Sequence, residues 1–365
     1  MKRNDFMDII KGLSIFCVVI GHAAWEITTQ AFAIPVGPFV YTFHLAAFFF
    51  CAGYLFKIDD EFQLGNYIVK RLKSLYLPFI KYSFAYVLIR NIFISLNVLE
   101  GVPYTLPDYI IVITNLLTFN GVGEFLAPFW FLPVMFWAMI LFAVIMSITH
   151  GLNKRIQTLL RLMLITLSGC IGLYTTERFF GLLYNIQIAY LMIPIVSLGY
   201  IFRKFESYIS GYINAITTII AFMILALVVH SNIGIIELSK FCIINHWVFY
   251  PVTIIGIWFC LGIGKGISQI APLKNLCILA GRKSFQIMAC HIACFKLIDL
   301  VYLSLFSTAI SNLASFPRSF EHLWPLYILS GILFPLGIDW LLTKVYRTAK
   351  LRERIYMYVN KIKQK

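Results

Sequence analysis

Residues 5–22 read DFMDIIKGLSIFCVVIGH, an apolar run that nevertheless carries Asp8, Lys11 and His22. On a helix, Lys11 lies three residues after Asp8, so the two side chains can pair. His22 follows eleven residues after Lys11, which is close to three full turns of 3.6 residues. The three side chains therefore share one stripe of a helix, with His22 about 16 Å further along the axis than Lys11.

The whole chain has the composition of a membrane protein. Of its 365 residues, 60% are hydrophobic and only 13% are charged, whereas soluble domains carry about 25% charged residues. About 20 apolar helical residues cross the ~30 Å core of a bilayer. The sequence predicts an all-α, polytopic transmembrane helical bundle of about ten spans, at 6–25, 37–56, 77–97, 128–148, 156–174, 183–202, 212–230, 246–264, 284–306 and 323–345. A further apolar stretch, 108–119, is too short to cross and is expected to be interfacial or re-entrant.

The distribution of Lys and Arg predicts the orientation of these spans. The chain has a net charge of +14, and most of its 30 Lys and Arg residues fall in alternate loops and near the two ends. Because basic residues mark cytoplasmic loops, both termini are expected in the cytoplasm. The same alternation argues against a basic face for nucleic acid. Residues 1–345 are expected to form a single integral-membrane domain, followed by a basic cytoplasmic tail at 346–365.

Polar residues inside the spans are the candidates for function. A charge at bilayer depth costs at least about 2.5–3.5 kcal/mol, so such a group usually faces a protein or water-filled interior. Glu26 continues the stripe of His22 on the same helix face, and His44 of the second span is expected at the same outer depth as His22. One interpretation is a polar channel from a cytoplasmic mouth at Lys11 to His22. The other is a snorkelling Asp–Lys pair with one hydrogen-bonded core histidine, and the helix geometry alone leaves both open.

A basic cluster marks the inner entrance of the third span, in the segment KRLKSLYLPF at 70–79. Lys70, Arg71 and Lys73 are either ordinary positive-inside anchors or, together, a clamp for the phosphates of a cytoplasmic donor. Pro78 is expected to open or bend this helix.

The ninth span contributes a second group of polar residues. Ser284 and His291 are seven residues apart and therefore share a helix face, while Lys296 and Asp299 are spaced to pair with each other. The eight cysteines of the chain show no zinc-type spacing, and we expect no metal site.

Five segments together resemble the acyltransferase 3 family of integral-membrane O-acyltransferases, in particular its fucose 4-O-acetylase-like branch. The first is a basic residue, ten residues and then histidine, here Lys11 and His22. The others follow in the family's order as FHLAAFFFCAGYLF at 43–56, KRLKSLYLPF at 70–79, FWFL at 129–132 and GRKSFQIMACH at 281–291.

This resemblance implies that the protein moves an acyl group, usually acetyl, from cytoplasmic acyl-CoA to a hydroxyl. The implied acceptor is a sugar in a cell-surface polysaccharide, a lipid-linked glycan or a related envelope glycan. Acetyl-CoA or another acyl-CoA would be a donor substrate, with no permanently bound cofactor. The implied location is the bacterial cytoplasmic (inner) membrane, as a multi-pass protein surrounded by lipid. A homo-oligomer and partners in glycan assembly stay open.

The resemblance also implies roles for the polar residues. Neutral histidine is the usual general base near pH 7, so His22 is the predicted base, while His44 would position the acceptor or stabilise the tetrahedral intermediate. Lys11 and Arg71 would steer the CoA phosphates, with Asp8 orienting Lys11. Lys70 and Lys73 join the donor-binding candidates, and the remaining candidates for the site are Glu26, Trp130, Ser284 and His291.

Two departures from the family pattern bear on these roles. Lys11 stands where the wider family has Arg, which keeps the charge but loses bidentate phosphate recognition. Ala46 and Ala47 replace a Met-Pro pair, so a helix kink at that point is not assured. An acyl-histidine relay remains an alternative to direct transfer. A proton-coupled transporter or flippase of an envelope precursor, and a non-catalytic membrane scaffold, remain alternatives to the enzyme.

Overall fold

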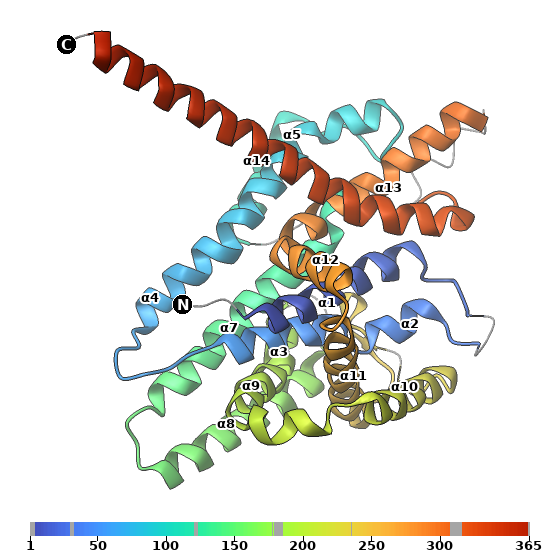
Figure 1. The fold of residues 1–365 in the computed structure, drawn as a ribbon. Coiled ribbons are helices and arrows are strands. Elements are labelled where there is room, and N and C mark those ends of the chain that lie inside the picture. Colours follow the sequence, from blue (N-terminus) through green and yellow to red (C-terminus); the bar gives the residue numbers. More distant parts are fainter. Residues whose placement is uncertain are drawn as a thin grey trace.

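A computed structural model describes residues 4–29, 33–119, 123–176, 178, 185–234, 236–306 and 316–363 of the chain. The fold is almost entirely helical (Figure 1). Its helices are α1 Asp5–Ala23, α2 Val36–Tyr41, α3 His44–Leu55, α4 Leu64–Arg71, α5 Leu77–Ser95, α6 Leu106–Leu117, α7 Phe131–Ile148, α8 Lys154–Thr176, α9 Ile186–Ile209, α10 Ala215–His230, α11 His246–Ile267, α12 Ala271–Arg282, α13 Ser284–Phe306 and α14 Trp324–Lys363. Two short strands, β1 Ile236–Glu237 and β2 Cys242–Ile243, form an antiparallel pair.

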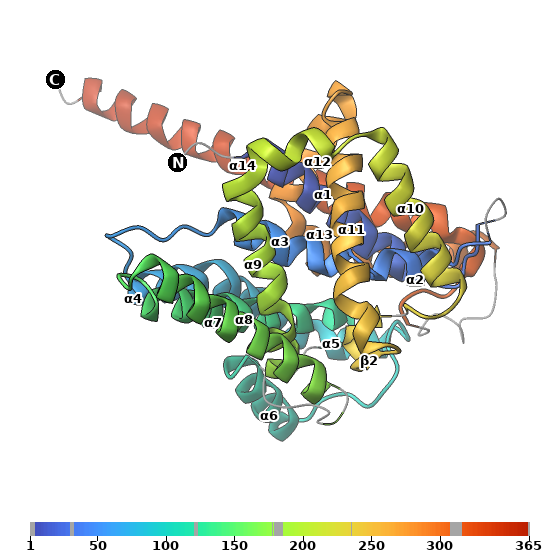
Figure 2. The ribbon, with the colours of Figure 1, turned by 90° about the horizontal axis from the view of Figure 1, so that it is seen from below.

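The predicted polytopic helical bundle is confirmed, with one difference in the count of spans. Within the described ranges, nine helical segments are long and apolar enough to cross a bilayer. The predicted span 212–230 forms α10, whose 16 residues extend only about 24 Å. The stretch 108–119 forms the 12-residue α6, which packs against α5 at the edge of the bundle (Figure 2). The first two residues of the predicted span 183–202 lie outside the described residues.

Helix α1 packs closely against α12, a helix that lies between two predicted spans and was not itself predicted. The contact depends on two glycines, because a Cβ at Gly12 would collide with the backbone carbonyl of Cys277, and one at Gly281 with that of Asp8. With hydrogen in place of a side chain, the two backbones can approach each other. This approach carries the end of α12 to the inner half of α1.

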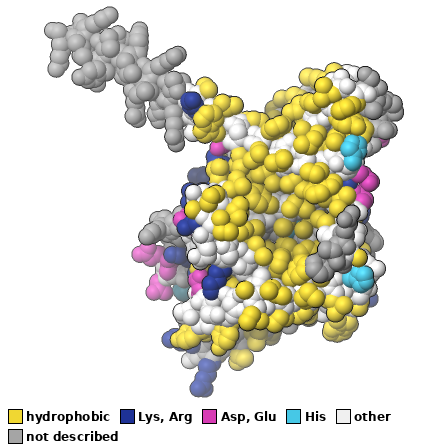
Figure 3. Space-filling model, turned by 45° about the vertical axis from the view of Figure 1, so that its right-hand side comes forward, with side chains coloured by type: hydrophobic (Ala, Val, Ile, Leu, Met, Phe, Trp, Pro, Cys, Tyr) yellow, Lys and Arg dark blue, Asp and Glu magenta, His cyan; other side chains and the backbone are white. Residues whose placement is uncertain are grey.

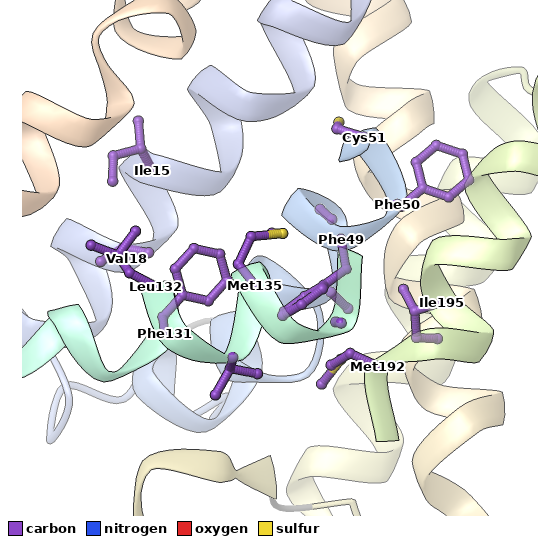
Figure 4. Packing of buried hydrophobic residues seen from close by; sticks show 14 of the residues in the cluster. Ile15, Val18, Phe49, Phe50, Cys51, Phe131, Leu132, Met135, Met192 and Ile195 are labelled. Atoms are coloured by element: carbon purple, nitrogen blue, oxygen red, sulfur yellow. The ribbon is translucent and has the colours of Figure 1, made fainter. Parts of the chain in front are cut away.

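The core beside α1 is formed by α3, α7 and α9. Figure 4 shows apolar side chains of α1 and of these three helices meeting between the ribbons, among them Ile15, Val18, Phe49, Phe131, Leu132, Met135, Met192 and Ile195. Each of these side chains is buried. The apolar packing holds α1 against its neighbours along the turns that precede His22.

The second span is broken immediately before His44. Helix α2 ends at Tyr41, and Phe43 leaves the helical region with φ −141° before α3 begins at His44. The break lies at 42–43 and not at Ala46 and Ala47, where the family pattern would put its Met-Pro pair. His44 is therefore the first residue of α3 and not a residue in the middle of a continuous helix.

The third span also differs from its prediction. It runs without a gap from Leu64 to Ser95, because α4 passes through a π-helical turn, Leu72–Tyr76, directly into α5. Pro78 lies in the first turn of α5, directly after the π-helical turn, in keeping with the prediction that it opens or bends this helix. Proline lacks an N–H and crowds the carbonyl four residues before it, and a widened turn accommodates both effects. The basic cluster 70–73 consequently lies within a helix.

The outer surface of the bundle is broadly apolar, as expected of a face toward lipid. Figure 3 shows hydrophobic side chains covering most of the face in view, with Lys and Arg gathered toward its left edge and lower end. Many large apolar residues of α5, α6, α8 and α10 are exposed.

The first and last helices run in opposite directions in Figure 1, so that the start of α1 and the end of α14 both point to the left. This agrees with the prediction that both ends lie on one side of the membrane. Helix α14 continues as one helix to Lys363, so most of the expected tail 346–365 is helical.

Candidate active site

A cavity of about 350 Å³ opens at the outer ends of α1 and α3. Among the described residues, its wall includes His22, His44, Glu26 and Trp130, all of which the sequence analysis named as candidates. His22 and Glu26 come from α1 and the turn after it, His44 starts α3, and Trp130 ends the 3₁₀ segment Glu124–Trp130 that leads into α7. The expectation that His22 and His44 reach one depth is consistent with their shared cavity.

His22 is in direct contact with His291 of α13. The Nδ1 atom of His22 lies 2.8 Å from Nε2 of His291, and the two rings lie edge to edge, with their centroids 5.1 Å apart and their planes 6° from parallel. His291 is fully buried. The two residues are 269 positions apart in the sequence, and no sequence pattern indicates that they lie at the same depth in the membrane. Their contact is therefore the main feature of the site that could not be predicted.

The hydrogen bonds of this pair assign a tautomer to each neutral ring. Nδ1 of His291 lies 3.0 Å from the carbonyl oxygen of Ile287, which can only accept, so Nδ1 of His291 carries the hydrogen. Nε2 of His291 is then an acceptor, and Nδ1 of His22 must donate to it. Nε2 of His22 is left with a free lone pair on a residue that lines the cavity.

His44 is fixed in a similar way. Its Nδ1 lies 2.9 Å from the carbonyl oxygen of Val40, which the break between α2 and α3 has released from the regular helical ladder. Nδ1 therefore donates, and Nε2 is left as an acceptor in neutral His44. The ring of Tyr41 packs against that of His44 with centroids 4.5 Å apart. A second imidazole nitrogen is thus available in the same cavity.

At the opposite end of α1, Asp8 joins two cations. Its side chain is only 2% exposed, and one carboxylate oxygen lies 2.5 Å from Nζ of Lys11, as predicted from their spacing. The other oxygen accepts from Nε of Arg282 at 3.1 Å, and Arg282 also bonds Asp5 at 2.8 Å. Arg282 lies between two predicted spans and has no role in the sequence-based prediction, and the close α1–α12 contact is what brings it here.

The rim of the cavity carries two ion pairs that the sequence did not predict. Arg318 pairs with Glu26, and Nζ of Lys240 lies 3.0 Å from an oxygen of Glu237. The β1–β2 hairpin presents Glu237 and Lys240. Helix α1 ends at Ala23, so the prediction that Glu26 lies on the same helix face is wrong, although Glu26 still reaches the cavity of His22 from the turn that follows.

The remaining candidates lie away from the cavity. Lys70 and Lys73 are exposed, and Arg71 is half-buried over the ring of Tyr67; in the described part of the chain, no hydrogen bond or ion pair joins these three to Lys11. Ser284 starts α13, about 10 Å along the axis from His291. In the same described part, no three His, Cys, Asp or Glu residues are grouped to hold a metal ion.

The sequence as a whole was compared with known families and proteins. Residues 4–344 match the acyltransferase 3 family, described as an acyltransferase domain, which is nearly the full length of the chain. The chain belongs to the acyltransferase 3 family. Comparison with curated proteins and with solved structures gives no match, and the family match does not distinguish the fucose 4-O-acetylase-like branch from others.

Membership of this family indicates which kind of protein this chain is, a question that the sequence motifs alone left open. The protein is a multi-pass membrane O-acyltransferase. The acyltransferase match runs from α1 into the first half of α14, so the cavity at His22 and the cluster at Asp8 both belong to the matched domain.

Proposed function

We propose that this acyltransferase moves an acetyl group from cytoplasmic acetyl-CoA to a sugar hydroxyl of an envelope glycan, in a bacterial cytoplasmic membrane, with His22 as general base. The observation that carries the proposal is the hydrogen-bonded histidine pair. Because Nδ1 of His22 is committed to His291 at 2.8 Å, the lone pair at Nε2 is the one offered to a substrate in the cavity. A base needs such a lone pair within reach of the proton it removes.

The chemistry follows from this arrangement. Nε2 of His22 takes the proton of the acceptor hydroxyl, whose oxygen attacks the thioester carbonyl and forms the acyl–oxygen bond. The tetrahedral intermediate then expels the CoA thiolate, which receives the proton from Nε2. During the interval when His22 is protonated, its Nδ1–H still donates to His291, so the ring keeps its position. His44 is suited to hold the acceptor. Once His44 is protonated, it can also donate a hydrogen bond to the oxyanion of the tetrahedral intermediate.

The donor is expected to enter from the opposite end of α1. Lys11 and Arg282 are held together by Asp8, and both keep further N–H groups that can bind phosphate oxygens. Arg71 is a second candidate, because its Nε is buried without a partner in the described part of the chain. From Lys11 to His22 the distance is about 16 Å along the helix, so the donor would extend along α1 toward His22.

The test uses the purified protein in lipid nanodiscs with ¹⁴C-acetyl-CoA and envelope glycan from a deletion strain. Wild-type protein should transfer label to the glycan, and His22→Gln should lower the rate by about 10²–10⁴-fold, the usual contribution of a general base. His230→Gln is the matched control, because His230 ends α10 on the exposed surface. A His22→Gln rate within a few-fold of wild type contradicts the proposed base.

A further inference from the structure

Arg318 is a buried cation whose bonding capacity is not fully used. The residue is only 8% exposed and lies in the wall of the cavity that contains His22. One of its terminal nitrogens bonds Glu26, whereas its Nε–H is buried and has no acceptor in the described part of the chain. Buried donors are nearly always satisfied, so an orphaned one on a side chain that lines a cavity leaves bonding capacity for a ligand there.

A buried network fixes the backbone beside Arg318. The Asp299 carboxylate of α13 accepts from the backbone N–H of Ser319 at 3.2 Å and from the Ser319 hydroxyl at 2.7 Å. It also accepts from the Tyr327 hydroxyl of α14 and lies 3.3 Å from Nζ of Lys296. Asp299 is fully buried. The predicted Lys296–Asp299 pair is confirmed, and this network holds in place the residue next to Arg318, which is how a binding residue on a loop becomes preorganised.

The charges at the rim of the cavity favour a neutral ligand. Arg318 is balanced by Glu26 and Lys240 by Glu237, so the described rim has no net charge. An acidic ligand would meet two carboxylates and would have to displace one of them. A hydroxyl needs no displacement, because its hydrogen can go to the Glu26 carboxylate, whose side chain is 54% exposed, while its oxygen accepts from the Arg318 guanidinium.

The aromatic walls of the cavity suit the apolar C–H face of a sugar ring. Trp25, Tyr41 and Trp130 line the cavity, and Trp25 packs edge-on against Tyr41 with ring centroids 4.7 Å apart. Flat aromatic faces pack against the C–H face of a pyranose, whose hydroxyls then point outward. A volume of about 350 Å³ is at the small end of ligand sites, so the cavity takes a terminal sugar unit rather than a length of polymer.

We propose that Arg318 and Glu26 bind hydroxyls of a neutral sugar unit in the acceptor, and that Asp299 positions Arg318 for this contact. This inference rests on the proposed function and specifies its acceptor. Arg318 is then a specificity-determining residue, since a site built to hydrogen-bond hydroxyls discriminates against analogues that leave its polar groups unpaired. Asp299 does not touch the substrate and acts only through the loop.

The first experiment measures steady-state kinetics in nanodiscs with ¹⁴C-acetyl-CoA and total envelope glycan from a deletion strain. Arg318→Gln should raise the KM for glycan about 10- to 100-fold, the range expected for hydrogen bonds to a charged group, and leave the KM for acetyl-CoA unchanged. Asp299→Asn should change the same parameter in the same direction. The control is Arg178→Gln, a cation that stacks on Tyr174 away from the cavity.

The second experiment locates the transferred acetyl group by tandem mass spectrometry of the product. Acetyl on a sugar residue without carboxylate or phosphate supports the inference. Acetyl on an acidic residue overturns it, as does an unchanged glycan KM in Arg318→Gln. A merely structural role for Arg318 and Asp299 would instead lower the melting temperature and kcat together. If the enzyme transfers acetyl in a His22-dependent way to a non-sugar hydroxyl, the neutral-sugar inference fails while the proposed base stands.

Discussion

Replacing His291 tests how its ring controls His22. His291→Leu removes the acceptor for Nδ1 of His22 while keeping an apolar side chain at a fully buried position. His291→Gln places a carbonyl oxygen near the former Nε2, where it can still accept from His22. His291→Asn, in contrast, reaches only as far as the former Nδ1, which bonds Ile287. The three variants therefore separate the hydrogen bond from the volume of the side chain.

The expected magnitude follows from what the bond does. A hydrogen bond between neutral groups contributes about 0.5–1.5 kcal/mol, which changes the population of the productive tautomer and ring orientation by up to about tenfold. A misplaced base adds a further loss, since an error of 1 Å can cost about 10²-fold. We expect kcat to fall about 10- to 10²-fold in His291→Leu and His291→Asn, and to stay within about tenfold of wild type in His291→Gln.

The assay is acetyl transfer in nanodiscs under saturating acetyl-CoA, with the melting temperature measured in parallel to exclude unfolding. His230→Leu controls for loss of a histidine outside the cavity. Full activity of His291→Leu would refute the positioning role. An inactive His291→Gln, equal to His22→Gln, would also refute it, because His291 would then itself be the group that exchanges the proton.

Two further predictions concern the inner half of α1. Gly281→Ala should destabilise the protein by about 1–3 kcal/mol, because its Cβ would collide with the Asp8 carbonyl; Gly266→Ala, with open space around it, should leave the melting temperature unchanged, and equal melting temperatures would contradict the close α1–α12 contact. Asp8→Asn should raise the KM for acetyl-CoA about tenfold by releasing Lys11 and Arg282. The same change should have little effect with acetyl-pantetheine, which lacks the nucleotide phosphates, and an equal effect on both donors would argue against phosphate binding at this cluster.

The bundle was predictable because its signals are local. Apolar runs of about 20 residues fix the existence of spans, and the Asp8–Lys11 and Lys296–Asp299 pairs follow from helix spacing alone. The shorter α10 and the continuous passage from α4 to α5 were not predictable in the same way. Helix ends and π-helical turns depend on how each segment packs and not only on its composition.

The candidate site was predictable only in part, because it is assembled across the chain. His22, His44 and Trp130 were placed through motifs, and the structure brings them to one cavity. His291 could be named but not placed, since its depth relative to His22 depends on the packing of α13. Arg282 and Arg318 lie outside the predicted spans, and nothing in the local sequence indicates that Asp8 and Glu26 are their partners.

The position of one hydrogen tests the account most directly. The protein is prepared with ¹⁵N-labelled histidine rings in nanodiscs, and the signals of His22 are assigned by comparison with His22→Gln. The account predicts that neutral His22 carries its hydrogen on Nδ1 and has an unprotonated Nε2, since its partner His291 accepts at 2.8 Å. A hydrogen on Nε2 of neutral His22 would contradict the account, because no lone pair would then face the substrate.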